Sequence, residues 1–133
     1  MKQLIFRFTE TAARRMLLLS SQEILRDAVI GLDARNRRLL VVDRAEQLIA
    51  LDDIDACSVK KDYAPIRPGM LRGRTIEAFL RRITLCLELK NGRGHEIVFY
   101  DVRADGRRAD AFEKRARRWA ESIRQLLHGP QAA

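Results

Sequence analysis

The sequence predicts an α+β fold, in which an antiparallel β roll or partly open barrel of about six to seven strands is closed by a C-terminal amphipathic helix, with an extra N-terminal helix. Two observations lead to this fold class. Residues 27–101 consist largely of short apolar and β-branched runs separated by turn residues, which is the pattern of antiparallel strands. Residues 106–128 instead place apolar side chains at helical spacing, and a small sheet with one apolar face needs such a cover.

Residues 1–25 are expected to form a largely helical extension. The stretch "LIFRF" fits a short strand, but a longer set of apolar residues recurs at helical spacing, and we favour a helix over residues 9–19. This set comprises Leu4, Phe8, Ala12, Met16 and Leu19. The stretch "SSQE" at 20–23 matches a capping box, with Ser20 as the N-cap and Glu23 as the residue that returns the hydrogen bond.

After residue 26 the pattern becomes that of strands. The runs "AVIGLD" and "RRLLVVD" flank "ARN", which indicates a hairpin turn, and "QLIALDDID" and "ACSVKKD" continue as two further short strands. Residues 60–82 contain two prolines and two glycines, so they are expected to connect two halves of the sheet rather than to form a central strand. Within them we expect one helical turn capped by Thr75, with the arginines exposed and three apolar residues buried, namely Ile76, Phe79 and Leu80.

The clearest hairpin is "RITLCLELKNGRGHEIVFYD" at residues 82–101. Its first half alternates apolar residues with Thr84, Cys86 and Glu88, which gives the strand one buried face. The dipeptide "NG" at 91–92 is the strongest short turn signal in the chain, and "HEIVFYD" is expected to return as the partner strand.

The C-terminal helix is expected to run from about residue 106 to residue 128, because Gly129-Pro130 ends it. Its core-facing stripe consists of Phe112, Ala116, Trp119, Ile123 and Leu126, with Leu127 beside it. The chain then divides into an N-terminal extension at 1–25, a β domain with its helix at 26–129, and a tail at 130–133.

Residues 26–127 resemble the pleckstrin-homology-like (PH-like) domains of small bacterial proteins. The resemblance rests on "AVIGLDARNRRLLVVD", on "LIALDDIDACSV", on the "ITLCLEL…HEIVFYD" hairpin and on the closing helix. It implies a strongly bent antiparallel sheet, one open end plugged by the helix, and a binding or scaffolding role without catalysis. The Pro/Arg-rich connection departs from the shorter, glycine-rich one that the family implies, and the first 25 residues have no counterpart there.

The net charge of +8 favours anionic partners. Three basic groups are candidate anion- or partner-binding surfaces. The first hairpin carries Arg35, Arg37 and Arg38, with Arg26 at the start of its first strand. The connection carries Lys60, Lys61, Arg67, Arg72, Arg74, Arg81 and Arg82. The outer face of the helix carries Arg107, Arg108, Lys114, Arg115, Arg117, Arg118 and Arg124.

Each group also fits a plain solvated surface. In eukaryotic lipid-binding pleckstrin-homology domains, basic residues around the first hairpin hold phosphoinositide head groups, and Arg35 and Arg37 resemble part of that pattern. In the connection, Tyr63 and Phe79 interleave with the basic residues, as stacking on single-stranded nucleic acid requires. Three acids on the helix partly neutralise the third group, which favours solvation there.

We expect no catalytic residues, no metal site and no cofactor. The sequence lacks the phosphate-binding loops and the nucleophile elbow of common enzyme classes. His95 and His128 stand alone, without metal-ligand spacing, and three aspartates of "LDDID" lack further oxygen ligands. Cys57 and Cys86 are expected to be free thiols, although a disulfide stays open because sequence cannot give their separation.

These expectations combine into a non-enzymatic binding or scaffolding module that engages a protein partner or associates with itself. The alternative is a basic surface that binds nucleic acid or anionic membrane head groups. No apolar run approaches the roughly 20 residues of a spanning helix, and the start of the sequence does not fit a signal peptide, so we expect a cytoplasmic protein.

Overall fold

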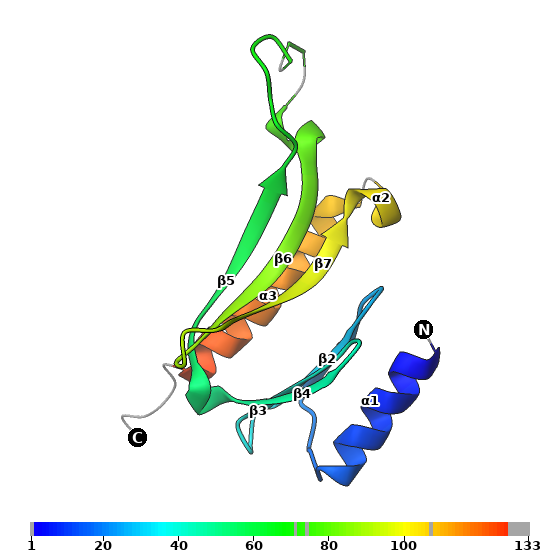
Figure 1. The fold of residues 1–133 in the computed structure, drawn as a ribbon, viewed down its shortest axis with the longest axis vertical. Helices are drawn as coiled ribbons and strands as arrows, with labels where there is room; N and C mark the ends of the chain where they lie inside the picture. The colour runs from blue at the N-terminus through cyan, green and yellow to red at the C-terminus, as the bar shows by residue number, and fades with distance from the viewer. Residues whose placement is uncertain (1, 71, 74, 107, 128–133) are drawn as a thin grey trace.

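The chain forms two antiparallel sheets with a helix at each end, as the computed structural model shows (Figure 1). The structure describes residues 2–70, 72–73, 75–106 and 108–127. The four-stranded sheet has the order β1-β2-β3-β4, and the three-stranded sheet has the order β5-β6-β7. The predictions of antiparallel strands, a C-terminal helix and an N-terminal helix are therefore confirmed.

The elements follow one another along the chain with short connections, except between β5 and β6. The four-stranded sheet comprises β1 Ser21–Ile24, β2 Val29–Asp33, β3 Arg38–Val42 and β4 Glu46–Ala50. The three-stranded sheet comprises β5 Ile54–Tyr63, β6 Leu80–Leu89 and β7 Gly94–Asp101. The helices are α1 Lys2–Arg14, α2 Val102–Asp105 and α3 Ala109–Leu127, and the two 3-10 turns are η1 Leu51–Asp53 and η2 Ile76–Phe79.

The expected barrel does not close in the described part of the chain. The turn η1 separates β4 from β5, so the hydrogen-bonded ladder of one sheet does not continue into the other. At the opposite side, β7 pairs with β6 and with no strand of the four-stranded sheet. The two sheets instead pack through side chains, and α3 lies against the three-stranded sheet (Figure 1).

The two central strands of the four-stranded sheet, β2 and β3, are buried on both faces. The inner face of the sheet joins the main core, which also holds residues of the three-stranded sheet and of α3, with Ile30 and Leu39 among the fully buried side chains. Its outer face packs against α1 through a second cluster that contains Phe8, Val29 and Leu40. The continuous apolar runs of β2 and β3 are explained by this two-sided burial, because successive strand residues point to opposite faces.

The N-terminal region differs from the expectation in two ways. The helix covers Lys2–Arg14 rather than residues 9–19, and Met16 leaves it with a positive φ of 56° and an 82% exposed side chain. The stretch "SSQE" does not cap a helix but lies in and before β1. There the amide of Ser20 donates to the carbonyl of Leu32 (2.8 Å), and the Glu23 carboxylate accepts from the Trp119 indole (3.2 Å). Strand pairing and tertiary contacts override the local capping signal.

The hairpin of β6 and β7 confirms the sequence expectation. Ile83, Leu85 and Leu87 are buried, and Gly92 adopts a φ of 88° in the turn, a conformation that glycine allows without strain. The stripe of α3 is also confirmed, because Ala116, Trp119 and Ile123 are buried while Phe112 and Leu126 are partly buried against the main core.

The helical turn in the connection is confirmed as η2, but the prediction that all three of its apolar residues are buried is wrong for one of them. Phe79 and Leu80 are buried, whereas Ile76 is 49% exposed. Thr75 occupies the N-cap position without a side-chain capping hydrogen bond. The turn is a single one, and burial increases along it toward β6, so Phe79 and Leu80 beside the strand are covered while Ile76 at the start of the turn is not.

Asp33 is an inaccessible carboxylate at the end of β2 that fixes both the hairpin turn and the entry to β1. It accepts hydrogen bonds from the amide of Leu18 (2.9 Å), from the amide of Asn36 (2.9 Å) and from the Asn36 side chain (2.8 Å). Burial raises the pKa of the carboxyl, but these hydrogen bonds outweigh burial and hold the pKa below its ordinary value of 3.8.

Gly31 on β2 provides a test of the contact with α1. An alanine Cβ there would lie 2.5 Å from Cζ of Phe8 and 3.1 Å from Cδ2 of Leu19. We expect Gly31→Ala to lower the free energy of unfolding by about 1–3 kcal/mol, measured by urea denaturation, because the buried ring and its helix must move. Gly94→Ala is the matched control, since its Cβ would meet only the Leu87 carbonyl at 3.7 Å. If the two variants are equally stable, the Phe8 contact does not set the position of α1.

Asp33→Asn should lower the free energy of unfolding by about 1–3 kcal/mol near neutral pH, because the turn loses its charged acceptor. A carboxyl whose pKa is lowered by folding stabilises the protein above the ordinary pKa of 3.8, and this contribution disappears as the pH falls through the folded pKa. Urea denaturation at several pH values should therefore show the variant and the native chain converging in acid. Exposed Asp55→Asn is the control, and a pH-independent difference would contradict the electrostatic role.

Candidate functional site

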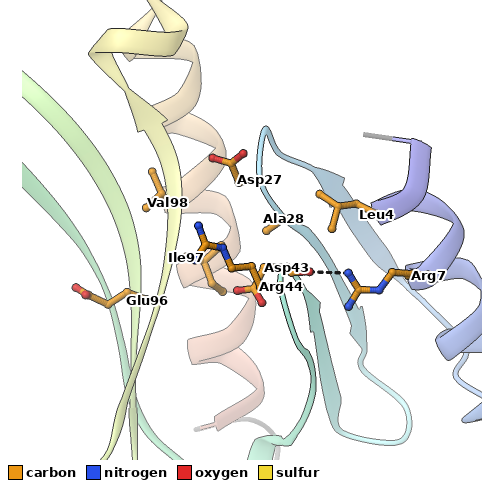
Figure 2. A pocket seen from close by; sticks show the side chains of 9 residues that line it. All are labelled: Leu4, Arg7, Asp27, Ala28, Asp43, Arg44, Glu96, Ile97 and Val98. Atoms are coloured by element: carbon orange, nitrogen blue, oxygen red, sulfur yellow. Dashed lines mark hydrogen bonds between the residues drawn. The ribbon is translucent and has the colours of Figure 1, made fainter.

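A groove of about 590 Å³ lies between the outer edge of β7 and the turns of the four-stranded sheet (Figure 2). Its walls come from α1, the β1–β2 turn, the β3–β4 turn and β7. The lining residues are Leu4, Arg7, Asp27, Ala28, Asp43, Arg44, Glu96, Ile97 and Val98. Figure 2 shows Arg44 extending toward β7 and Arg7 directed at the backbone of Asp43.

The β7 edge is the strand edge that opens onto this groove. β7 pairs only with β6 among the described strands, so alternate backbone amide and carbonyl groups face away from the sheet. The free edge of β5 differs, because the Arg124 guanidinium donates to the carbonyl of Cys57 at 2.8 Å. Val98 on β7 is 44% exposed, so the open edge also presents an apolar side chain.

Charges of both signs line the groove. Arg7 is engaged, because it donates to the carbonyl of Asp43 at 2.9 Å and lies 3.8 Å from the Glu46 carboxylate. Arg44 forms no ion pair within the described residues. At the β1–β2 turn, Arg26 donates to the carbonyl of Ala104 at 2.9 Å and thereby links the four-stranded sheet to α2. The groove is therefore amphipathic rather than a strong anion site.

A second site, which we call the basic hollow, gathers part of the basic connection. Its volume is about 420 Å³, and four cations and two acids line it together with Tyr63 and Val102. The cations are Lys60, Arg81, Arg82 and Arg103, and the acids are Asp62 and Asp101. The structure thus brings together three of the basic residues that the sequence singled out and adds Arg103 from α2, which sequence analysis missed.

Lys61 points away from the basic hollow, toward α3. Its Nζ lies 3.0 Å from the Glu113 carboxylate and 3.2 Å from that of Glu77, and Glu113 also pairs with Arg117 at 2.8 Å. Burial lowers the pKa of Lys61, but the hydrogen bonds to the two carboxylates outweigh burial and raise it above 10.5. The hydrogen bond from Lys61 in turn holds the pKa of Glu113 below its ordinary value. Lys61 is an internal ion-pair residue, not a free anion ligand.

The first basic group does not form one site. Arg37 bonds the Asp52 carboxylate at 2.9 Å and the carbonyl of Leu126 at 3.0 Å, so it fastens the hairpin to the end of α3. Arg35 is exposed in the turn and Arg38 is exposed at the first position of β3, where it donates to nearby backbone carbonyls.

The remaining basic residues are spread over two regions. Arg67 and Arg72 are exposed in the connection that extends beyond the ends of β5 and β6 (Figure 1), and Arg74 lies outside the described residues. On α3, Arg115 lies 5.1 Å from the Phe112 ring and 3.8 Å from Glu23, so this face is partly neutralised. Arg107, which the sequence also predicts on the outer face of the helix, lies outside the described part of the chain.

The described residues do not assemble the groups of a metal or thiol site. Groups of three or more His, Cys, Asp or Glu side chains placed for a metal are absent from them, and His128 is outside them. Cys57 and Cys86 are free. Because Cys86 pairs with Ser58, the neighbour of Cys57, the two thiols point to opposite faces of the sheet. Burial raises the pKa of Cys57 to about 11 and also raises that of Cys86, so both are thiols near neutral pH.

In the described part of the chain, helices of the length and apolarity needed to span a membrane are absent. Comparisons of the chain with family models, with curated proteins and with solved structures find no significant match. The fold and the two sites described above are therefore the basis for assigning a function.

Substitution of two adjacent lysines tests whether Lys61 stabilises the fold while its neighbour Lys60 does not. Lys61→Met should lower the free energy of unfolding by about 1 kcal/mol, because Glu113 and Glu77 lose their shared partner. Because the pKa of Lys61 is raised, this stabilisation is complete below 10.5 and is lost as the pH rises through the folded pKa. Urea denaturation and an NMR titration of Glu113, whose pKa should rise in the variant, are the measurements.

Lys60→Met is the matched control, because this exposed lysine has only a 3.6 Å pair with Asp62. We expect a change within about 0.5 kcal/mol for this variant. Equal effects of the two substitutions would contradict the structural role of Lys61.

Proposed function

We propose that the protein is a non-enzymatic PH-like binding module that accepts an extended segment of a partner protein along β7. The observation that carries this proposal is the open edge of β7 beside the amphipathic groove. In such strand addition, main-chain hydrogen bonds supply affinity and pockets for alternate side chains supply specificity.

The PH-like part of the proposal is supported by the strand arrangement. Four consecutive antiparallel strands, three further antiparallel strands and a C-terminal helix on the second sheet fit the bent sheet and helical plug that the resemblance implies. The apolar residues that line the groove suit a partner strand whose alternate residues are apolar, and Val98 is the most exposed of them. They are Leu4, Ala28, Ile97 and Val98.

The state of the two cysteines supports a binding role, because neither is an activated nucleophile in the described part of the chain. Both cysteines remain protonated near neutral pH because burial raises the pKa of each thiol. Two free thiols also suit a reducing compartment, so we include a cytoplasmic location in the proposal.

A second candidate function is binding of anions at the basic surface, as the net charge of +8 favours. The observation that favours it is the basic hollow, which gathers four cations around two acids. This site lies at the far end of β5 and β6 and does not share a lining residue with the groove.

Val98→Lys tests the proposed docking along β7. A lysine on a strand edge opposes the addition of another strand, so capture of the partner from a lysate of the native cells should fall at least about tenfold. The captured protein is identified by mass spectrometry, and hydrogen exchange of β7 amides then shows whether it protects this strand. Light scattering of the purified chain separates a different partner from a second copy of the same chain.

Ile76→Lys is the matched control, because Ile76 is similarly exposed but lies in η2, outside the groove. We expect this variant to capture the partner as the native chain does. Loss of capture with Ile76→Lys and not with Val98→Lys would move the contact to the connection and overturn docking at β7.

A further inference from the structure

We propose that the basic hollow is a binding site for a phosphate-bearing anion. The proposal rests on the second candidate function, binding of anions at the basic surface, and is independent of strand addition at β7, because the two sites have no lining residue in common. The ligand carries a phosphate group with unesterified oxygens, which a free phosphate compound and a lipid head group both present.

A β-bulge places two consecutive arginines on one side of the sheet. In the register of β5 and β6, Asp62 pairs with Arg82 and Tyr63 pairs with Leu80, so Arg81 is an extra residue without a partner on β5. Successive residues of a regular strand point to opposite faces, and a bulge re-aims one of them. Arg81 and Arg82 consequently both line the hollow.

Two of the four cations are available for a ligand. Lys60 lies 3.6 Å from Asp62, and Arg82 lies 3.7 Å from Asp101. The guanidinium groups of Arg81 and Arg103 form neither an ion pair nor a side-chain hydrogen bond with the described residues, and both side chains are on exposed residues. Four cations against two acids leave the hollow with a formal excess of two positive charges.

The two free guanidinium groups match the oxygens of a phosphate. An arginine presents a planar fork of N–H donors that bonds phosphate oxygens in pairs, which distinguishes it from a diffuse positive surface. The acids reinforce this arrangement, because they hold Lys60 and Arg82 at the wall while leaving the excess charge on Arg81 and Arg103.

Two other residues of the candidate basic groups are already paired and are not open to a ligand. Lys61 forms ion pairs with two carboxylates, and Arg37 donates hydrogen bonds to Asp52 and to the end of α3. The volume of about 420 Å³ is large enough for one phosphate group or head group. We therefore assign the anion preference of this part of the chain to the hollow and not to the whole surface.

The test is an NMR titration of the full ¹⁵N-labelled chain with inorganic pyrophosphate, at low salt and against chloride of matched ionic strength. Amide shifts should concentrate at residues 60–63, 81–82 and 101–103. The double variant Arg81→Glu/Arg103→Glu should weaken binding at least about tenfold, because it removes both free guanidinium groups and adds repulsion.

The matched control is Arg35→Glu/Arg38→Glu. It changes the net charge by the same amount at two exposed arginines, one in the β2–β3 turn and one at the start of β3, near the end of α3 that is opposite to α2. We expect its affinity for pyrophosphate to stay within about threefold of native, because only the long-range electrostatic attraction changes and salt screens it. Native-like urea denaturation of both double variants confirms that each is folded.

Vesicles of phosphatidylcholine, with and without phosphatidic acid, distinguish the sources of the phosphate. If the native chain binds the acidic vesicles and the Arg81→Glu/Arg103→Glu variant does not, the ligand of the hollow is a lipid head group. If the native chain binds pyrophosphate but not the vesicles, the ligand is a free phosphate compound. Both results support the site.

Three results would overturn it. The Arg81→Glu/Arg103→Glu variant could bind pyrophosphate as tightly as the native chain, or both double variants could weaken binding equally, which would indicate only a general positive field. The third result is that a single-stranded oligonucleotide shifts the amide resonances of the outer face of α3 while pyrophosphate does not bind in the hollow. This result would assign the basic surface to nucleic acid instead.

Discussion

The burial of β2 and β3 on both faces is the constraint from which the rest of the fold follows. Val29 and Leu40 face outward and Ile30 and Leu39 face inward, and all four side chains are nearly inaccessible. A sheet with two apolar faces must be covered twice. The three-stranded sheet with α3 covers the inner face, and α1 covers the outer face, so the N-terminal helix is a structural layer and not an appendage.

This arrangement explains how far the sequence could predict the fold. The β6–β7 hairpin and the stripe on α3 have strong local signals, an Asn-Gly turn and a helical apolar period, and both were predicted correctly. β1 was missed because Ser20 and Glu23 imitate a capping box, while their real partners, Leu32 and Trp119, are distant in sequence. Closure of a barrel depends on pairing between distant strand edges, and local patterns carry no information about it.

The candidate sites were less predictable than the fold. The sequence identified the basic connection, but it could not separate Lys60 from Lys61, which point to opposite sides of β5. It also could not foresee that Arg103 joins Arg81, because a β-bulge and the short helix α2 create that proximity. The open edge of β7 has no local signal at all, since "HEIVFYD" would read the same with a strand on either side.

The separation of the α1 contact from the main core has a consequence for solubility. α1 packs against its own small cluster, so it can open locally at a lower free energy than the unfolding of the whole domain requires. An opened helix would uncover Val29, Leu40 and Val42 on adjoining strands, a continuous apolar strip of high β-propensity. The tendency of the chain to aggregate should therefore depend on the docking of α1 in addition to the stability of the whole domain.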